Sequence, residues 1–425
     1  MKVLVVSNNC FAKNNSNGRI LGLLFKKIPV EDVAQFYIVN GTNDFDVCSN
    51  YYMVDDHMAI RSLYSLKGIG KVINKPQADI SHLQKMSKYR AKYGRSSLTM
   101  LIRNFVWMRF KWWNADFEKW LKDFNPDVLL LQCGDAPFMY EISCRISEFL
   151  NIPIVEFNTE FYYFEKDNYI NNNDPEFLFK YYKHKLCKSF KKAMNQTKVS
   201  IYNSEWLKRN YDMEFGMPST FIYQSSEYRC ERTNVKHEAP HITYVGNFSF
   251  KRYEALAEIA NAICEINPSW RLSVYGMMQN EETREIFERT PGIDYKGVVP
   301  YDDVQRVIAD SDVLVLTESL KPEMSKNTAY GFSTKITDYL FSGIPILAYG
   351  PSNNVGMNYL KDNDAAVVVF DKSTLKDQLN ELITNEQLRN KLSNKETEIA
   401  HMNHDAEVNS EKFISILKTI KSITI

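Results

Sequence analysis

Short apolar runs alternate with segments of helical periodicity along most of the chain. Strands of a parallel sheet are covered by helices on both faces, so they read as short continuous apolar runs. The pattern therefore predicts an α/β fold in which strands and helices alternate. In the first half we expect strands at 2–7, 128–132, 154–157 and 199–203, and helices at 19–27, 140–150 and 205–211.

The second half repeats this alternation with clearer boundaries. The polar stretch 227–240 has no period and ends in proline, as is typical of a linker. A length of 425 residues also suits two domains, so we place the boundary near residue 230. The expected strands are 241–246, 271–275, 293–298, 312–317, 344–348 and 365–370, and the expected helices 253–266, 302–309 and 334–341.

Composition excludes several classes of protein. Basic and acidic residues number 52 each, which argues against a general nucleic-acid binder. The first apolar run stops at Asn8, so we interpret it as a strand rather than a secretory signal, and no run reaches the roughly 18 apolar residues of a membrane-spanning helix. The seven cysteines are scattered without a Cys-x-x-Cys pair, which fits a reducing compartment. We expect a cytoplasmic protein.

Residues 84–113 depart from the alternation. They contain eight Lys or Arg, no Asp or Glu, and seven aromatic residues. Basic residues mixed with aromatics suit an anionic bilayer surface. The alternative is an amphipathic helix with core aromatics and solvated charges. A second basic stretch, 180–192, is interpreted as a solvated helix face.

The most specific motif opens the helix expected at 334–341. A helix that starts with Ser333 and Thr334 leaves backbone N–H groups at the positive end of its dipole, where an anionic diphosphate is stabilised. Lys335 adds a positive charge there. Asp338 lies about one turn inside the helix, where it can accept hydrogen bonds from a ribose diol. The alternative is a capped helix whose Asp338 interacts only with the dipole.

The run 333–345 resembles the donor-binding segment of GT-B glycosyltransferases, specifically the retaining enzymes of glycosyltransferase family 4. The shared pattern is Ser-x-Lys-x-x-Asp-Tyr-Leu-x-x-Gly-x-Pro. In that family a Glu holds the donor ribose, and Asp338 occupies its position. A second Glu of the family, near the donor sugar, is replaced here by Tyr330. Glu318 and Glu323 are the candidates for its role.

The resemblance also implies an architecture. GT-B enzymes have two facing Rossmann-like domains with a C-terminal helix that crosses back to the first domain. We therefore expect an acceptor domain at 1–230, a donor domain at 231–405 and a returning helix at 406–425. Five apolar residues spaced along the last segment fit such a helix: Phe413, Ile414, Ile416, Leu417 and Ile420.

A second motif follows the first strand of the donor domain. Similar enzymes carry an Arg directly after the glycine and a Lys five residues later, and after Gly246 these positions hold Asn247 and Arg252. Cations here neutralise the charge that builds on a leaving diphosphate. Arg252 is expected to do this, with Lys251 or Lys335 compensating for the missing cation. A solvated Lys-Arg pair is the alternative.

The remaining site residues are expected from the same resemblance. Segment 296–301 resembles the part that lines the nucleotide base, with Val298 nearest to it. On the acceptor side, Gly18 lies where related enzymes let the backbone approach the donor diphosphate. Glu160 and Tyr162 follow another expected strand and would face the same cleft.

No metal is expected. The pairs Asp44/Asp46 and Asp310/Asp312 have Asp-x-Asp spacing but lie outside a suitable context, and the histidines form no ligand spacing. The chain also contains no P-loop sequence.

The sequence thus predicts a metal-independent, retaining glycosyltransferase without a cofactor. It would move a sugar from a nucleotide diphosphate donor to a glycan or lipid-linked acceptor, in bacterial surface polysaccharide synthesis, with membrane contact through 84–113. A nucleotide-sugar epimerase of the same fold is one alternative. An inactive glycosyltransferase-like binding subunit is the other, because Tyr330 and Asn247 replace charged residues of the family.

Overall fold

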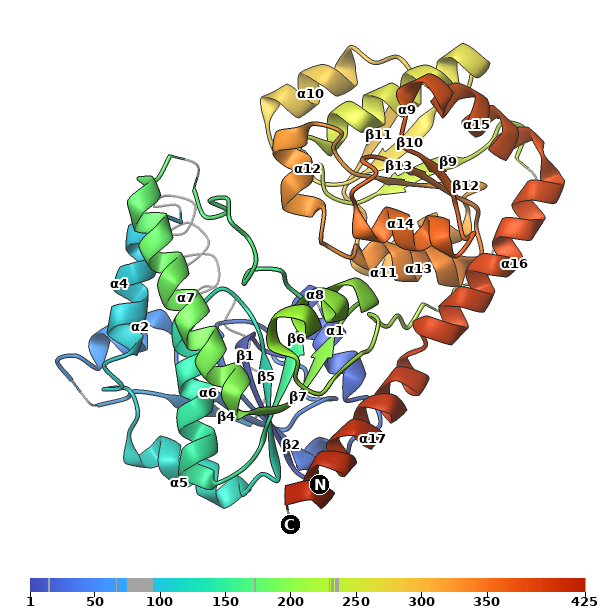
Figure 1. The fold of residues 1–425 in the computed structure, drawn as a ribbon. Helices are drawn as coiled ribbons and strands as arrows, with labels where there is room; N and C mark the ends of the chain where they lie inside the picture. The colour runs from blue at the N-terminus through green and yellow to red at the C-terminus, as the bar shows by residue number, and fades with distance from the viewer. Residues whose placement is uncertain are drawn as a thin grey trace. The chain divides into compact units, whose positions relative to one another are not determined.

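The computed structural model describes all residues except 14, 15, 66, 75–94, 172, 229, 231, 232, 234–236 and 425. It divides into two compact units (Figure 1): an N-terminal domain of residues 1–223 and 406–425, and a C-terminal domain of residues 224–405. The division precedes the expected boundary at 230 because Gln224 already belongs to the second domain. Its side-chain amide donates a hydrogen bond to the Phe332 carbonyl at 3.2 Å.

The N-terminal domain is built on an eight-stranded sheet in the order β4-β3-β2-β1-β5-β6-β7-β8. All pairs are parallel except β3 and β4. The strands are β1 (Val3–Asn9), β2 (Val33–Val39), β3 (Asn50–Met53), β4 (Lys71–Ile73), β5 (Val128–Gln132), β6 (Ile154–Asn158), β7 (Thr197–Tyr202) and β8 (Ser219–Phe221). The helices are α1 (Ser16–Leu24), η1 (Val30–Asp32), α2 (Asp56–Arg61), α4 (Ser97–Trp107), α5 (Ala115–Phe124), α6 (Pro137–Leu150), α7 (Glu176–Gln196), α8 (Glu205–Phe215) and α17 (Ala406–Thr424).

The two faces of this sheet bury separate cores, because successive strand residues point to opposite faces. Leu4 and Leu129 face a core that includes Trp107 of α4. Val5 and Leu130 face the other core, which includes Phe413 of α17. Both faces of the central strands are therefore dry, as their continuous apolar sequences predict.

The C-terminal domain contains a fully parallel six-stranded sheet in the order β11-β10-β9-β12-β13-β14. Its strands are β9 (Ile242–Val245), β10 (Leu272–Tyr275), β11 (Ile293–Gly297), β12 (Val313–Thr317), β13 (Ile346–Tyr349) and β14 (Val367–Val369). Its helices are α9 (Arg252–Ile266), α10 (Glu281–Glu288), α11 (Tyr301–Ala309), α12 (Pro322–Thr328), α13 (Thr334–Ser342), α14 (Val355–Asp362), α15 (Lys372–Thr384) and α16 (Glu386–Asn403).

Local sequence explains where many helices begin and end. The side chain of Asn114 accepts a hydrogen bond from the first turn of α5, and Ser204 does the same for α8. Gly343 ends α13 with φ of 61°, a left-handed conformation that glycine adopts without steric cost. The expected elements around the donor motif consequently appear within a few residues of their predicted bounds.

Other elements were missed by the sequence reading. The elements that were not expected are β2, β3, β4, β8, α2, α5, α10, α12 and α14. In the stretch 84–113, residues 84–94 lie outside the described part of the chain. The rest forms α4 and the turn after it. Trp107 and Trp112 are 1% and 0% exposed, which makes them core residues.

Helix α17 returns the chain to the N-terminal domain, as expected. Its Ser410 hydroxyl donates a hydrogen bond to the Leu24 carbonyl at 2.9 Å, and Lys421 forms an ion pair with Asp127 at 2.9 Å. The ring of Phe413 meets that of Phe25 edge to face, with centroids 5.2 Å apart. Across the described residues, none of the helices has both the length and the apolar content needed to cross a bilayer.

We predict that Phe413→Ala lowers the free energy of unfolding of the N-terminal domain by about 3 kcal/mol. The substitution opens a cavity between α17 and the rest of this domain, from which α17 is distant in sequence. Urea unfolding followed by tryptophan fluorescence reports on this domain, which holds five of the six tryptophans. Lys412→Ala, on the exposed side of the same helix, is the control and should change stability little. Equal stability of Phe413→Ala and wild type would contradict the packing of α17.

Candidate functional site

The loops after three neighbouring strands of the C-terminal domain meet at the carboxyl edge of the sheet. The Gly246 amide after β9 donates to the Tyr275 carbonyl, and the Gly276 amide after β10 donates to the Gly297 carbonyl, both at 2.9 Å. A Cβ on Gly276 would lie 2.0 Å from the Gly246 carbonyl oxygen, so only glycine permits this approach. Val298 follows directly at the same edge and is 64% exposed.

A buried ion pair joins the start of α9 to the end of β12. The Arg252 guanidinium donates through Nε and Nη2 to the two oxygens of Glu318, each at 2.9 Å. Its Nη1 donates to Asn247 Oδ1 at 2.8 Å. Arg252 and Glu318 are only 8% and 5% exposed, so this bidentate geometry compensates for much of their desolvation. The structure therefore brings three of the expected site residues together.

Lys335 lies beside this pair. A Cβ on Gly246 would come within 2.9 Å of the Lys335 ammonium, so the glycine leaves room for the cation. Burial, and next the positive charge of Arg252, lower the pKa of Lys335 to about 8, although the Glu318 carboxylate opposes the shift. An ammonium with this pKa is charged in only part of the molecules slightly above neutral pH. A bound anion would favour the charged form.

Helix α13 opens next to Lys335. Ser333 is its N-cap residue, with extended backbone angles, but the Ser333 side chain does not cap the helix. Gly331 before it is exposed, and a Cβ there would meet only the Thr328 carbonyl, at 3.6 Å. The first N–H groups of α13, including that of Thr334, thus lie where an anion is stabilised by the helix dipole.

Asp338, one turn further along α13, has a protein partner. Its Oδ1 accepts a hydrogen bond from the Ser226 hydroxyl, and Ser226 Oγ accepts from the Tyr228 amide at 3.0 Å. Asp338 therefore fastens the segment after β8 to the C-terminal domain. The sequence reading missed Ser226, because a serine in a polar stretch carries no distinguishing pattern.

The other candidates divide between the site and its surroundings. Lys251 lies 4.0 Å from Glu254 and 3.7 Å from Glu282, so acidic side chains balance its charge outside the ion-pair cluster. Glu323 lies in the exposed first turn of α12, whereas Glu318 contacts Arg252. Tyr330 is 36% exposed. Of the suggested substitutes for the missing cation and carboxylate, Lys335 and Glu318 are the ones that lie together.

Tyr244 is a member of the cluster that the sequence reading did not identify. Its hydroxyl donates to the Asn247 carbonyl at 2.6 Å, which fixes the turn after β9. The Lys335 ammonium lies 5.5 Å from the centre of its ring, within reach of a cation–π interaction. An aromatic residue inside a strand indicates only a core position. The sequence therefore gave no sign that Tyr244 would also contact Asn247 and Lys335.

On the N-terminal domain, Gly18 allows α1 to start close to the loop after β1. A Cβ there would lie 2.3 Å from the Cys10 carbonyl oxygen and 2.8 Å from the Ala12 amide nitrogen. The packing within this domain thus already requires glycine at the position.

Glu160 and Tyr162 follow β6 and line a narrow pocket together with Gly134 from the neighbouring loop after β5. Burial, with a smaller effect of the Asp135 carboxylate, raises the pKa of Glu160 to about 7. Asp135 is itself held by an ion pair with Arg95. This carboxyl group therefore changes its charge near neutral pH, in a space too narrow for a water molecule.

We predict that Glu318→Gln lowers the stability of the C-terminal domain by about 3 kcal/mol, because it leaves the buried Arg252 guanidinium without its counter-ion. Urea unfolding followed by circular dichroism measures the change. The matched control is Glu254→Gln, which removes a more exposed carboxylate 2.8 Å from the Lys321 ammonium and should cost less than about 1 kcal/mol. Equal losses in the two variants would contradict a buried role for Glu318.

Solved structures of known proteins share this fold over nearly the whole chain. Anabaena Alr3699/HepE in complex with UDP and glucose has 12% sequence identity and a TM-score of 0.62, with 98% of this chain and 99% of that chain covered. Sucrose-phosphate synthase from Thermosynechococcus elongatus has 10% identity and a TM-score of 0.63, with 99% of both chains covered. A glycosyltransferase from Rickettsia africae has 14% identity and a TM-score of 0.60, with 99% and 98% covered.

Sequence comparison agrees with the structural likeness. Among curated protein sequences none matches the chain. Residues 239–385, which contain Gly246, Arg252, Glu318, Lys335 and Asp338, match the family described as Glycosyl transferases group 1. The chain thus has the fold of GT-B glycosyltransferases, and residues 239–385 of its C-terminal domain are similar to the glycosyl transferases group 1.

Proposed function

We propose that this protein transfers a sugar from a nucleotide diphosphate sugar to a glycan or lipid-linked acceptor, as part of bacterial surface polysaccharide synthesis. The observation that carries the proposal is the pair of cations, Arg252 and Lys335, beside the opening of α13 at the carboxyl edge of the sheet. Ligands of open parallel sheets bind at this edge. Structures of HepE contain UDP or UDP-glucose, which makes uridine the first base to test.

The donor diphosphate would lie between the α13 amides and the two cations. As the bond between the sugar and the diphosphate breaks, negative charge grows on the leaving oxygen, and Lys335 and Arg252 stabilise it. These fixed cations supply the charge neutralisation that a metal ion provides in other transferases, so we propose metal-independent transfer. If transfer is retaining, the acceptor oxygen forms its bond to the sugar on the face that the diphosphate leaves, and a phosphate oxygen takes the acceptor proton.

Glu318 has a positioning role in this proposal. Its carboxylate holds the Arg252 guanidinium through both oxygens and keeps a positive charge buried before the donor binds. Val298 would contact the base and Asp338 the ribose. Gly18, Glu160 and Tyr162 remain the acceptor-side candidates, with Glu160 favoured by its pKa near 7.

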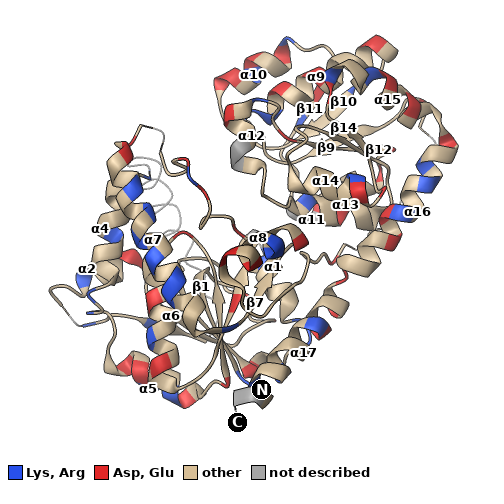
Figure 2. Ribbon diagram, in the orientation of Figure 1, with Lys and Arg blue, Asp and Glu red and all other residues tan. Residues whose placement is uncertain are grey.

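A basic and apolar surface of the N-terminal domain supports a lipid-linked acceptor. Three apolar side chains of α4, Leu98, Ile102 and Phe105, are 51%, 55% and 55% exposed. They recur at helical spacing and therefore share one face. Helix α7 packs against α4 and carries six lysines along its length (Figure 2). Three of these lysines, Lys180, Lys191 and Lys192, form ion pairs with glutamates. An exposed apolar helix face next to a lysine-rich helix suits the headgroup region of an anionic membrane.

An inactive binding subunit is the second candidate. Asn247 stands at the position where the family has a charged residue. Its neutral side chain accepts a hydrogen bond from Arg252 Nη1. Arg252 thereby makes three hydrogen bonds inside the protein. If those bonds persist when a donor binds, the site would recognise a nucleotide sugar without stabilising its cleavage.

The first test is thermal stabilisation by a panel of nucleoside diphosphates and nucleotide sugars, because a ligand of the folded state raises the melting temperature. We expect one base to stabilise the wild type and Lys335→Ala to lose the response. Lys251→Ala serves as the matched control, since it removes a cation outside the cluster, and should keep the response. No shift with any compound would refute the donor site, whereas binding without sugar transfer or donor hydrolysis would favour the inactive subunit.

A second test uses the lowered pKa of Lys335. The diphosphate binds the protonated ammonium best. Raising the pH through about 8 deprotonates Lys335 in the ligand-free protein, and binding of the diphosphate therefore weakens. We predict a loss of about tenfold in nucleoside diphosphate affinity between about pH 7.5 and 9.5. Lys335→Arg stays charged over this range and should bind with little pH dependence. If affinity falls equally with pH in the wild type and in Lys335→Arg, the charge of Lys335 does not control binding of the diphosphate.

A third test concerns the membrane surface. Ile102→Asp places a charge in the centre of the exposed face of α4, so we expect binding to anionic phospholipid vesicles in a sedimentation assay to fall about tenfold or more. Lys119→Asp makes a charge change on α5, away from α4, and is the control. If Ile102→Asp sediments with vesicles as wild type does, this face does not contact lipid.

A further inference from the structure

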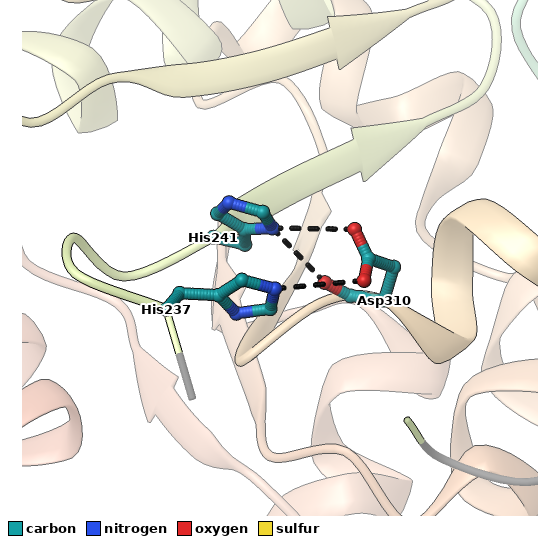
Figure 3. A group of neighbouring side chains, drawn as sticks. All are labelled: His237, His241 and Asp310. Atoms are coloured by element: carbon teal, nitrogen blue, oxygen red, sulfur yellow. Dashed lines mark hydrogen bonds and ion pairs between the residues drawn. The ribbon is translucent and has the colours of Figure 1, made fainter. Parts of the chain in front are cut away.

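Two histidines and two aspartates come together at the amino edge of the C-terminal sheet, opposite the donor site. His237 and His241 precede β9, and Asp310 lies at the end of α11, just before β12. Figure 3 shows both imidazole rings turned toward the Asp310 carboxylate. The His237 side chain is 10% exposed, whereas those of His241 and Asp310 are 47% and 51% exposed. The group is therefore anchored on one side and open to solvent on the other.

The backbone holds these side chains in place. The Asp312 amide donates to the His241 carbonyl at 2.8 Å, which joins the segment before β9 to the turn before β12. The Asp310 amide donates to the Arg306 carbonyl at 3.0 Å and so continues α11. Both strands then enter the sheet side by side. The positions of His241 and Asp310 relative to each other thus follow from the sheet itself.

The distances suit a small tetrahedral ion. His237 Nε2 lies 3.5 Å from Asp310 Oδ1, and His241 Nδ1 lies 3.4 Å from Asp310 Oδ2. One ligand atom from each residue falls within 4.8 Å of the others. Zinc bonds of about 2.0–2.1 Å in a tetrahedron separate neighbouring ligand atoms by about 3.3 Å. The two imidazole rings are stacked with their centroids 3.4 Å apart, and His241 Nδ1 also lies 3.1 Å from the Asp310 carbonyl oxygen. Metal binding would therefore require the His241 ring to rotate out of this stack and leave that hydrogen bond.

A fourth residue orients the first histidine. Asp312 Oδ2 lies 2.9 Å from His237 Nδ1, so it can accept the proton of that nitrogen. This leaves the Nε2 lone pair of His237 directed toward Asp310. A carboxylate behind a ligating imidazole is a usual feature of zinc sites, because it fixes the tautomer and raises the basicity of the ligand.

We propose that His237, His241 and Asp310 bind Zn²⁺, with Asp312 as the positioning residue of His237 and the fourth coordination position open to water. Imidazole ligands favour zinc over Mg²⁺ or Ca²⁺, which prefer oxygen. The ion would tie the segment that carries His237 to the α11–β12 turn. The strands between this edge and the donor edge are four or five residues long, about 15 Å, so the ion has no part in sugar transfer.

The test is a titration of metal-free, full-length protein with ZnCl₂ by isothermal calorimetry and thermal unfolding. We expect one tight site and a melting temperature that rises by a few degrees. His241→Asn and Asp310→Asn should each weaken binding at least tenfold, and Asp312→Asn about 10–100-fold. His184→Asn, an exposed histidine of the other domain, is the control and should bind as wild type does.

Co²⁺ absorption provides a readout that does not depend on variants. Tetrahedral nitrogen and oxygen ligation gives intense visible bands without a thiolate charge-transfer band, and this is the expected spectrum. A thiolate band would place the metal on a cysteine such as Cys230 and overturn the proposal. Zn²⁺ affinity that is unchanged in the folded double variant His237→Asn/His241→Asn would overturn it as well.

Discussion

The crossover geometry of parallel strands is the constraint on which the rest of this structure depends. Two parallel neighbours cannot be joined by a tight turn, so a helix must carry the chain back, and every strand then ends at the same edge. In the C-terminal domain this rule brings the residues after β9, β10, β11 and β12 to one edge although they are far apart in sequence. It also brings the residues before β9 and β12 together at the opposite edge.

The carboxyl edge of the C-terminal sheet combines this geometry with unusual electrostatics. Arg252 and Glu318 form a buried bidentate pair, and Lys335 is a second, partly buried cation whose pKa is lowered to about 8. Burying positive charge is unfavourable unless it is compensated, and one carboxylate compensates only one of the two cations. The cluster is therefore short of negative charge before a ligand binds, which is the property expected of a site for an anionic diphosphate.

The amino edge has the opposite balance. Its side chains include two carboxylates, those of Asp310 and Asp312, which face two imidazoles. The two sites that we propose, one for an anion and one for a cation, therefore lie at opposite edges of the same sheet. The Asp-x-Asp pair that was set aside as a catalytic motif belongs to the second of these. The spacing of residues within one segment does not indicate this group, because the histidines come from a different segment of the chain.

Sequence by itself determined the fold class, the approximate bounds of most strands in the C-terminal domain, and the donor motif from Ser333 onward. These features depend on local periodicity, capping residues and dipoles, which act over a few neighbouring residues. Tertiary structure decided which charges meet. It put Glu318 rather than Glu323 against Arg252, gave Lys335 rather than Lys251 to the cluster, and joined Ser226 to Asp338. Such contacts connect residues tens to over a hundred positions apart, and their electrostatics depend on burial that periodicity does not specify.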